Sequence, residues 1–327
     1  MASFVVYGAG GIGGVLGARL HEAGHEVVLV ARGAHREVIE RAGLRVECPT
    51  GTTTVRIPVS ESPGGLRLGP DDIVLLTMKS QDTEAALREL RVSASVETHV
   101  VCVQNGVENE RAALRRFANV YGVCVMFPTT FLEPGVVTAH SSPVEGILDV
   151  GRCPSGVDDV VGVVSAAFGS ATFESETRPD IMRWKYGKLL LNLGNAIEAV
   201  CGPPARQSNI GRLARQEGEA VFEAAGIGFV SEDEDRARRG DLIRVQPVGG
   251  RAREGGSSWQ SLRRGTGTVE TDYVNGEVVL LGRLHGIPTP VNELLQRLAA
   301  ELARDGRPPG SVTPDEFLEL VRATRSA

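Results

Sequence analysis

The chain has 327 residues, of which 42% are hydrophobic and 23% charged, and its formal net charge is −6. This length is typical of about two domains, and the composition excludes a globally disordered chain. The mild acidic excess argues against a nucleic-acid-binding protein, because phosphate binding needs a basic face. The 40 glycines are unusual, since an average protein has ~7% glycine.

No segment reaches the ~18 unbroken apolar residues of a membrane span, and no basic region precedes the first apolar run, as a secretory signal would require. We therefore expect a cytoplasmic protein that does not bind membranes. The five cysteines are scattered, without a C-x-x-C pair, so no metal site or redox motif is predicted. They are expected to be buried or neutral thiols in a reducing compartment.

The first half of the chain alternates strand-like and helix-like segments. Short β-branched runs predict buried parallel strands at 4–7, 27–30, 73–76, 100–103 and 120–126, and helical patterns lie between them at 12–23, 35–42, 83–90 and 108–117. This alternation predicts an α/β fold with a doubly wound sheet. The segments 52–59 and 135–150 are expected to add antiparallel strands.

From Pro179 onward, helical spacing of apolar residues dominates, at 181–200, 210–225, 269–285, 291–303 and 314–324. The chain is therefore divided into an α/β domain, residues 1–178, and an all-helical domain, residues 179–327. The apolar helices between 269 and 303 could form a homodimer face, but core packing explains the same pattern.

The segment 232–256 departs from both patterns. Four acidic residues precede three arginines between 232 and 239, an order that suits the macrodipole of a short helix. The glycine-rich part that follows, 247–256, is predicted to be a loop. It could be a solvated surface loop or a lid over a site formed by the residues after it.

Gly8-Ala9-Gly10-Gly11-Ile12-Gly13 forms a G-x-G-x-x-G pattern at the end of the first strand, where the first helix begins. Gly8 permits a tight turn, Gly10 allows the backbone to approach a pyrophosphate, and Gly13 allows close packing of helix on strand. The unpaired N–H groups of the helix would meet the negative charge of the ligand. This loop predicts a dinucleotide site in a Rossmann-type domain.

Arg32 follows the second predicted strand, where an NAD-preferring site would place a carboxylate for the ribose 2′-hydroxyl. A guanidinium matches a 2′-phosphate instead, so NADP(H) is the predicted cofactor. Lys79 and the Gln104-Asn105-Gly106 run follow two further strands, at the sheet edge where such folds bind ligands. Asn-Gly can equally be a plain turn.

Lys188 and Asn192 are four residues apart, so they share one face of a predicted helix. A lysine among leucines and glycines is costly to bury unpaired, which suggests a proton donor for a carbonyl oxygen. Lys185 is interpreted as a solvated lysine. Glu270, in a first helical turn, is by itself a favourable dipole partner.

These residues together resemble one family, the ketopantoate reductases (2-dehydropantoate 2-reductases), along nearly the whole chain. The markers are, in order, the Gly8–Gly13 loop, Arg32, Lys79, Gln104-Asn105-Gly106, Lys188-x-x-x-Asn192, Ser257-Ser258 and Glu270-x-Asp272-Tyr273-x-Asn275-Gly276. The resemblance implies a Rossmann domain, a helical catalytic domain, and reduction of the 2-oxo group of ketopantoate by NADPH in pantothenate biosynthesis. It implies no metal.

The resemblance also implies roles for single residues. Lys188 would be the general acid, and Asn192 and Ser258 would hold the substrate. Asn105 would touch both substrate and cofactor. Lys79 and Glu270 would contact the cofactor, with Glu270 also near the catalytic lysine.

The substrate side departs from the family pattern. A second Asn is expected four residues after Asn192, where this chain has Ala196, with Asn195 one residue early. An amide expected three residues before Ser258 is replaced by Gly255. Two alternatives therefore stay open: a paralogous NADPH-dependent reductase of another carbonyl or imine, and a non-catalytic NADP-binding sensor.

Overall fold

The computed structural model describes residues 3–325. Contacts between Cα atoms group the chain into two compact units. The first unit holds the residues up to Lys185 together with Ser231–Arg253, and the second holds Tyr186–Val230 and the residues from Glu254 onward. The segment 231–253 thus belongs to the first unit, although the sequence places it within residues 179–327. The domain division at residue 178 stays a prediction.

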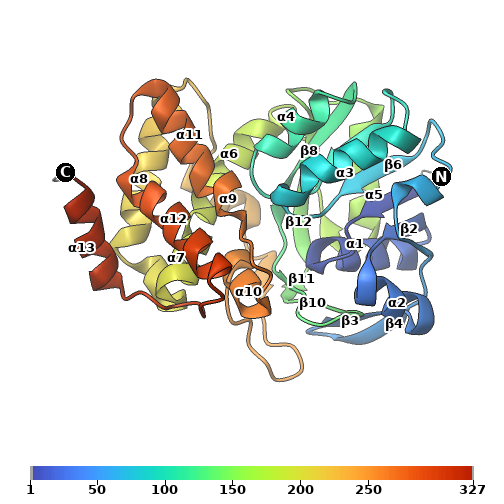
Figure 1. Ribbon diagram of the computed structural model, residues 1–327. Helices are drawn as coiled ribbons and strands as arrows, with labels where there is room; N and C mark the ends of the chain where they lie inside the picture. The colour runs from blue at the N-terminus through green and yellow to red at the C-terminus, as the bar shows by residue number, and fades with distance from the viewer. Residues whose placement is uncertain (1–2, 326–327) are drawn as a thin grey trace. The chain divides into compact units, whose positions relative to one another are not determined.

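The first unit is built on a mostly parallel sheet (Figure 1). Within residues 3–325 this sheet has eight strands, in the order β13 (Phe173–Glu174), β12 (Gly146–Arg152), β8 (Asn119–Met126), β7 (His99–Cys102), β6 (Ile73–Leu76), β1 (Ser3–Tyr7), β2 (Glu26–Val30) and β5 (Val59–Ser60). Neighbouring strands from β5 to β8 run parallel, whereas β12 is antiparallel to β8. The sheet order reverses on either side of β1, which is where doubly wound folds bind their ligands.

Helices cover both faces of this sheet, and the apolar strand residues lie buried between them. The helices are α1 (Gly11–Glu22), α2 (Gly33–Ala42), α3 (Ser80–Ser93), α4 (Glu108–Leu114) and α5 (Asp159–Ser170), with a short 3-10 turn, η1, at Pro63–Gly65. The helices α1 and α5 contact each other, and α3 contacts α4. The predicted doubly wound α/β fold is therefore confirmed.

Smaller sheets extend the first unit. The strands β4 (Gly51–Val55), β3 (Leu44–Cys48), β10 (Val136–Ala139) and β9 (Thr129–Thr130) form one of them. In another, β11 (Ser141–Pro143) pairs with β14 (Ile243–Val245). The helix α9 (Glu232–Arg239) precedes β14 and begins with a capping box between Ser231 and Glu234.

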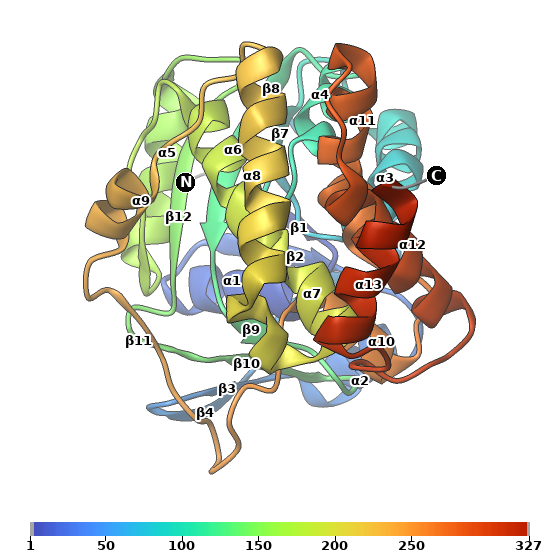
Figure 2. The same cartoon turned by 90° about the vertical axis from the view of Figure 1, so that its left-hand side faces the viewer.

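The second unit is helical (Figure 2). It contains α7 (Gly194–Cys201), α8 (Asn209–Ala224), α10 (Ser257–Arg264), α11 (Asn275–His285), α12 (Pro290–Arg304) and α13 (Pro314–Arg325), with the 3-10 turns η2 (Pro203–Gln207) and η3 (Glu270–Tyr273). The helix α6 (Ile181–Asn192) begins in the first unit and ends in the second. The helices α8, α11 and α12 pack against one another.

A buried polar cluster joins three helices of the second unit. The Glu217 carboxylate of α8 accepts hydrogen bonds from the backbone N–H groups of Val291 and Asn292, both at 3.0 Å, at the start of α12. The Asn292 side chain donates to the Ala214 carbonyl at 2.9 Å and accepts from Asn275 at 3.0 Å. Glu217 therefore acts as a helix cap supplied from a neighbouring helix.

The predicted parallel strands are confirmed, and most helix ends lie within a few residues of those expected. The predicted helix 181–200 is wrong as a single element, because α6 ends at Asn192 and α7 starts at Gly194. The addition at 135–150 is only partly antiparallel, since β10 runs parallel to β3. Among the described residues, no helix is long and apolar enough to cross a membrane.

The helix α1 packs closely at Gly13 against the residues that follow β1 and β6. A Cβ atom at this position would lie 2.3 Å from both the Gly8 carbonyl oxygen and the Thr77 hydroxyl. We predict that Gly13→Ala lowers the free energy of unfolding by about 3 kcal/mol, because an extra methyl group overpacks this contact, and that it weakens nucleotide binding.

The control for this prediction is Gly162→Ala on the exposed face of α5, where a Cβ would meet nothing within 4 Å. That change is expected to stabilise by ~0.5–1 kcal/mol, because alanine favours a helix interior. Urea unfolding measures both values. Equal stability of the two variants would contradict the packing role of Gly13.

Candidate cofactor and catalytic sites

The glycine-rich loop presents open backbone at the start of α1. The N-cap residue of α1 is Gly10, which offers no side chain to cap the first helical N–H groups. A Cβ on Gly10 would meet only Phe131, at 3.9 Å, whereas Gly8 has a φ of +106° and its Cβ would lie 2.9 Å from the Met78 nitrogen. The helix N-terminus therefore fits a pyrophosphate, with uncapped donors and an open approach.

The other loop residues face the protein. Ala9 is buried, so only its backbone is available to a ligand, whereas Ile12 is partly buried and packs against the core. His35 on α2 braces the loop, because its ring contacts the Ala9 carbonyl oxygen at 2.7 Å and accepts from the Gly135 N–H at 2.9 Å. Burial lowers the pKa of His35, which favours the neutral ring. Sequence reasoning missed His35, since its partners lie far away along the chain.

Arg32 follows β2 directly and its side chain is 60% exposed. Its guanidinium forms an ion pair with Glu89 of α3 and donates to the Tyr7 hydroxyl at 3.2 Å. The Tyr7 hydroxyl in turn donates to Glu89. Arg32 therefore lies after β2, as the sequence predicts, but its guanidinium is paired with Glu89, a partner that the sequence did not reveal.

The carboxyl ends of β6 and β7 are joined by a buried polar network. The side-chain amide of Gln104 donates to the Met78 carbonyl oxygen at 2.9 Å and to the Thr83 hydroxyl at 2.8 Å. The Thr83 hydroxyl donates to the Asn109 side chain at 2.8 Å. The segment that contains Lys79 is thus fixed to the segment that contains Asn105.

The same network fixes the backbone of Asn105. The Asn109 side chain donates to the Asn105 carbonyl oxygen at 2.9 Å and to the Ser80 hydroxyl at 3.0 Å. Lys79 and Asn105 themselves are half-buried. These hydrogen bonds tie the backbone beside both candidate cofactor residues to the neighbouring segment.

Lys185 is buried, with 3% exposure, and the expectation that it is solvated is wrong. Its ammonium lies 2.8 Å from the Glu110 carboxylate and donates to the carbonyl oxygens of Gln104 at 2.7 Å and Val123 at 3.1 Å. One carboxylate and two carbonyl oxygens thus surround its positive charge. The sequence reasoning failed here because Glu110 comes from α4, far from Lys185 in the chain.

We predict that Lys185→Met lowers the free energy of unfolding by about 3–5 kcal/mol, because it leaves the Glu110 carboxylate buried without its partner. The double variant Lys185→Met/Glu110→Leu should recover part of this loss, since it removes both charges. Urea unfolding followed by circular dichroism measures the difference.

Arg183→Met on the same helix is the control, because Arg183 is partly exposed and pairs with Glu234 at the surface. A surface ion pair contributes far less stability than a buried one. Equal losses for Lys185→Met and Arg183→Met would contradict the role of the buried pair.

In the second unit, Lys188 and Asn192 lie one turn apart on α6. Lys188 is half-buried and Asn192 is buried, with 5% exposure. The break between α6 and α7 follows at Leu193. Asn195 lies in the first turn of α7, where its side chain contacts Ser257 at 3.4 Å.

Ser258 and Glu270 are both buried in the second unit. Ser258 lies in the first turn of α10, and the N-cap residue of that helix, Gly256, donates its N–H to the Glu198 carboxylate at 2.6 Å. Glu198 also pairs with Arg206 at 2.8 Å. Glu198 therefore holds the start of α10, and with it the position of Ser258, a role that the sequence did not indicate.

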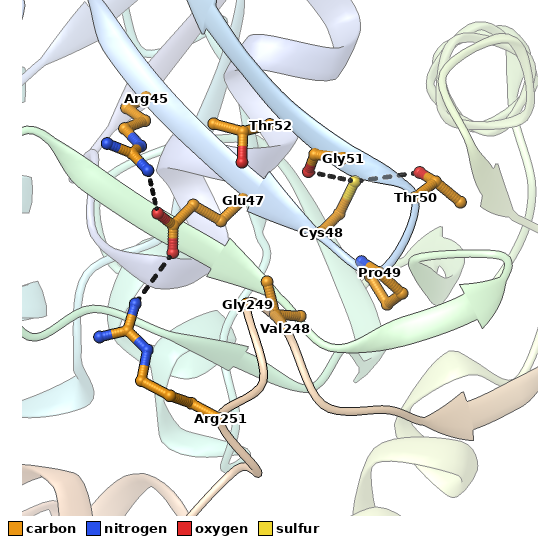
Figure 3. A pocket seen from close by; sticks show the side chains of 10 residues that line it. All are labelled: Arg45, Glu47, Cys48, Pro49, Thr50, Gly51, Thr52, Val248, Gly249 and Arg251. Atoms are coloured by element: carbon orange, nitrogen blue, oxygen red, sulfur yellow. Dashed lines mark hydrogen bonds and ion pairs between the residues drawn. The ribbon is translucent and has the colours of Figure 1, made fainter.

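A pocket of about 540 Å³ lies at the hairpin of β3 and β4 in the first unit (Figure 3). Glu47 reaches between two arginines there, at 2.7 Å from Arg45 and 3.5 Å from Arg251. Val248, Gly249 and Arg251 of the predicted loop line this pocket. None of the cofactor or substrate residues expected from the sequence lines it.

All five cysteines are free thiols. Burial raises the pKa of Cys102, as it does for Cys153, and it raises the pKa of Cys201 to about 11, so these thiols are neutral near pH 7. Across residues 3–325, no group of three or more His, Cys, Asp or Glu side chains is arranged to hold a metal ion.

The fold and the glycine-rich loop define a dinucleotide-binding α/β protein. Residues 4–154 match the family described as ketopantoate reductase PanE/ApbA, and residues 180–303 match its C-terminal family. The chain therefore belongs to the ketopantoate reductase family. It is an oxidoreductase that acts on CH–OH groups with a nicotinamide cofactor and a small-molecule substrate.

Relatives span nearly the whole chain. The 2-dehydropantoate 2-reductase of Halobacterium salinarum is 30% identical over 92% of this chain and 99% of its own length. That of Pyrococcus horikoshii is 28% identical over 90% of this chain and 95% of its own.

Solved structures agree with this assignment. A PanE/ApbA family ketopantoate reductase from Ralstonia eutropha JMP134 has a TM-score of 0.77 at 27% identity, covering 94% of this chain and 99% of that one. D-mandelate dehydrogenase with NADH and anilino(oxo)acetate has a TM-score of 0.80 at 20% identity, with the same coverage, and shows likeness of fold.

Proposed function

We propose that this protein reduces a 2-oxo acid to a 2-hydroxy acid with NADPH, and that the substrate is 2-dehydropantoate, which becomes pantoate in pantothenate biosynthesis. The observation that carries the proposal is the pair of Lys188 and Asn192 on one face of α6, in a chain that belongs to the ketopantoate reductase family. Relatives named 2-dehydropantoate 2-reductase support this choice of substrate.

In this proposal the nicotinamide, when bound, supplies the hydride to C2 of the substrate. Negative charge then develops on the carbonyl oxygen, and the Lys188 ammonium stabilises this charge and donates the proton. Asn192 and Ser258 bind the substrate, and Asn105 contacts both substrate and cofactor. Glu270 contacts the cofactor and acts with Lys188.

The proposed cofactor site lies in the first unit. The N–H groups at the start of α1, from Gly11 onward, bind the pyrophosphate. Gly10 allows its approach, Gly8 permits the tight turn, and Gly13 allows the close packing of α1. Arg32 binds the 2′-phosphate, and Lys79 binds the cofactor from the end of β6. The exposure of Arg32 and the uncapped start of α1 support these roles.

We predict that Lys188→Ala lowers kcat by roughly 10²–10⁴-fold, since it removes the proton donor, while the affinity for NADPH stays near that of the wild type. Lys188→Arg keeps the charge but gives up its proton far less readily, so it should stay strongly impaired. Steady-state oxidation of NADPH and calorimetric titration measure the two quantities. Recovery of turnover in Lys188→Arg would contradict proton donation by Lys188.

A substrate panel tests the choice of 2-oxo acid. We expect kcat/KM for 2-dehydropantoate to exceed that for pyruvate, 2-oxobutyrate, 2-oxoisovalerate and benzoylformate by more than about tenfold, a factor that one or two extra substrate contacts supply. Benzoylformate is included because a structural neighbour is a mandelate dehydrogenase. Equal rates would favour a paralogous reductase, and tight NADPH binding without turnover would favour a sensor.

A homodimer face formed by the helices between 269 and 303 stays one of two possibilities, since core packing explains the same pattern. Within this region α11 exposes Leu280 and Leu284, which lie one turn apart with 47% and 69% exposure. A second copy of the chain could cover them. The molar mass in solution, measured by light scattering, decides between monomer and dimer.

A further inference from the structure

The arginine proposed to bind the 2′-phosphate already has an anionic partner. Arg32 after β2, Tyr7 at the end of β1 and Glu89 of α3 meet at one point of the first unit, where each side chain bonds to the other two. The Glu89 side chain is 32% exposed and that of Arg32 60% exposed. Both charges are therefore within reach of a ligand that approaches the end of β2.

The wider neighbourhood is close to neutral rather than cationic. Asp82, in the first turn of α3, is near enough to Lys79 and Arg32 that both lower its pKa, although burial, the larger effect, raises it. Arg36, the next arginine along α2, pairs with Glu40 at 2.9 Å. The carboxylates of Glu89 and Asp82 thus lie near Arg32 and Lys79, the two cations proposed to bind the cofactor. A phosphate monoester carries a charge of about −1.5 to −2 at pH 7, so these carboxylates disfavour it.

We propose that Glu89 is a specificity-determining residue for the dinucleotide. It competes with the ribose 2′-phosphate for Arg32, and thereby lowers the preference for NADPH over NADH that Arg32 would otherwise produce. A 2′-hydroxyl is uncharged and can donate to a carboxylate, so NADH binds without breaking the ion pair. The inference rests on the proposed role of Arg32 in the cofactor site.

The test is calorimetric titration of the full chain with NADP⁺ and NAD⁺, which needs no substrate and no turnover. Glu89→Gln keeps the shape and one acceptor of the side chain but removes its charge. We expect it to tighten NADP⁺ binding by about tenfold, or ~1.4 kcal/mol, and to leave NAD⁺ binding unchanged or weaker.

Glu84→Gln is the matched control. Glu84 lies on the same helix and pairs with Arg88 at 3.0 Å and with Arg116, so this variant changes the net charge of the protein equally. The ratio of the two dissociation constants should stay at the wild-type value. A shift as large as that of Glu89→Gln would reveal a general charge effect and overturn the inference.

The Arg32→Met background tests whether Glu89 acts through Arg32. There, the gain in NADP⁺ affinity from Glu89→Gln should largely disappear, because the guanidinium for which Glu89 and the 2′-phosphate compete is absent. A gain of the same size in this background would overturn the proposal, as would an unchanged ratio in the single variant.

These outcomes are separable from failure of the proposed function. If 2-dehydropantoate is not reduced, the binding ratios still decide the role of Glu89. If the wild type binds neither nucleotide, the proposed cofactor site fails first, and the inference that rests on it fails with it.

Discussion

The buried ion pair between Lys185 and Glu110 connects several elements of the first unit. The Lys185 ammonium also binds the carbonyl oxygens of Gln104 and Val123, so one cation joins α6, the helix α4, the segment after β7 and the middle of β8. Loss of either partner would leave an uncompensated buried charge, which costs much stability. The contacts of Lys185 therefore form a junction that holds these elements together. The backbone that presents Asn105 begins at this junction, because Gln104 precedes it directly.

From this junction, polar side chains continue along the carboxyl edge of the sheet. Gln104, Thr83, Asn109 and Ser80 fix the segments after β6 and β7 to each other. Beyond β1, Arg32, Tyr7 and Glu89 form the next cluster. The edge therefore carries a hydrogen-bonded segment at Asn105 and an ion pair at Arg32, the residue proposed to bind the 2′-phosphate. In the role proposed for Glu89, this ion pair changes the preference between NADPH and NADH without a change in the fold.

The glycine-rich loop and the buried strands could be predicted from local sequence patterns. Gly8, Gly10 and Gly13 follow from their spacing at the junction of the first predicted strand and helix, because a tight turn and a close helix contact there require glycine. The buried strands followed from runs of β-branched residues. Lys185 was misjudged, because burial of a lysine depends on an acidic partner, and Glu110 is distant in the chain. Glu89, His35 and Glu198 were missed for the same reason, since each acts through a partner on another element.

The sequence by itself determined the fold class, the dinucleotide loop and the helical spacing of Lys188 and Asn192. These features depend on residue type and on separations of a few residues, which backbone geometry converts directly into position. Only the tertiary structure decided that Lys185 is buried in an ion pair, that Glu89 holds Arg32, and that the helix breaks after Asn192. Charge pairing and burial depend on residues that meet only when distant elements pack together, so no local pattern records them.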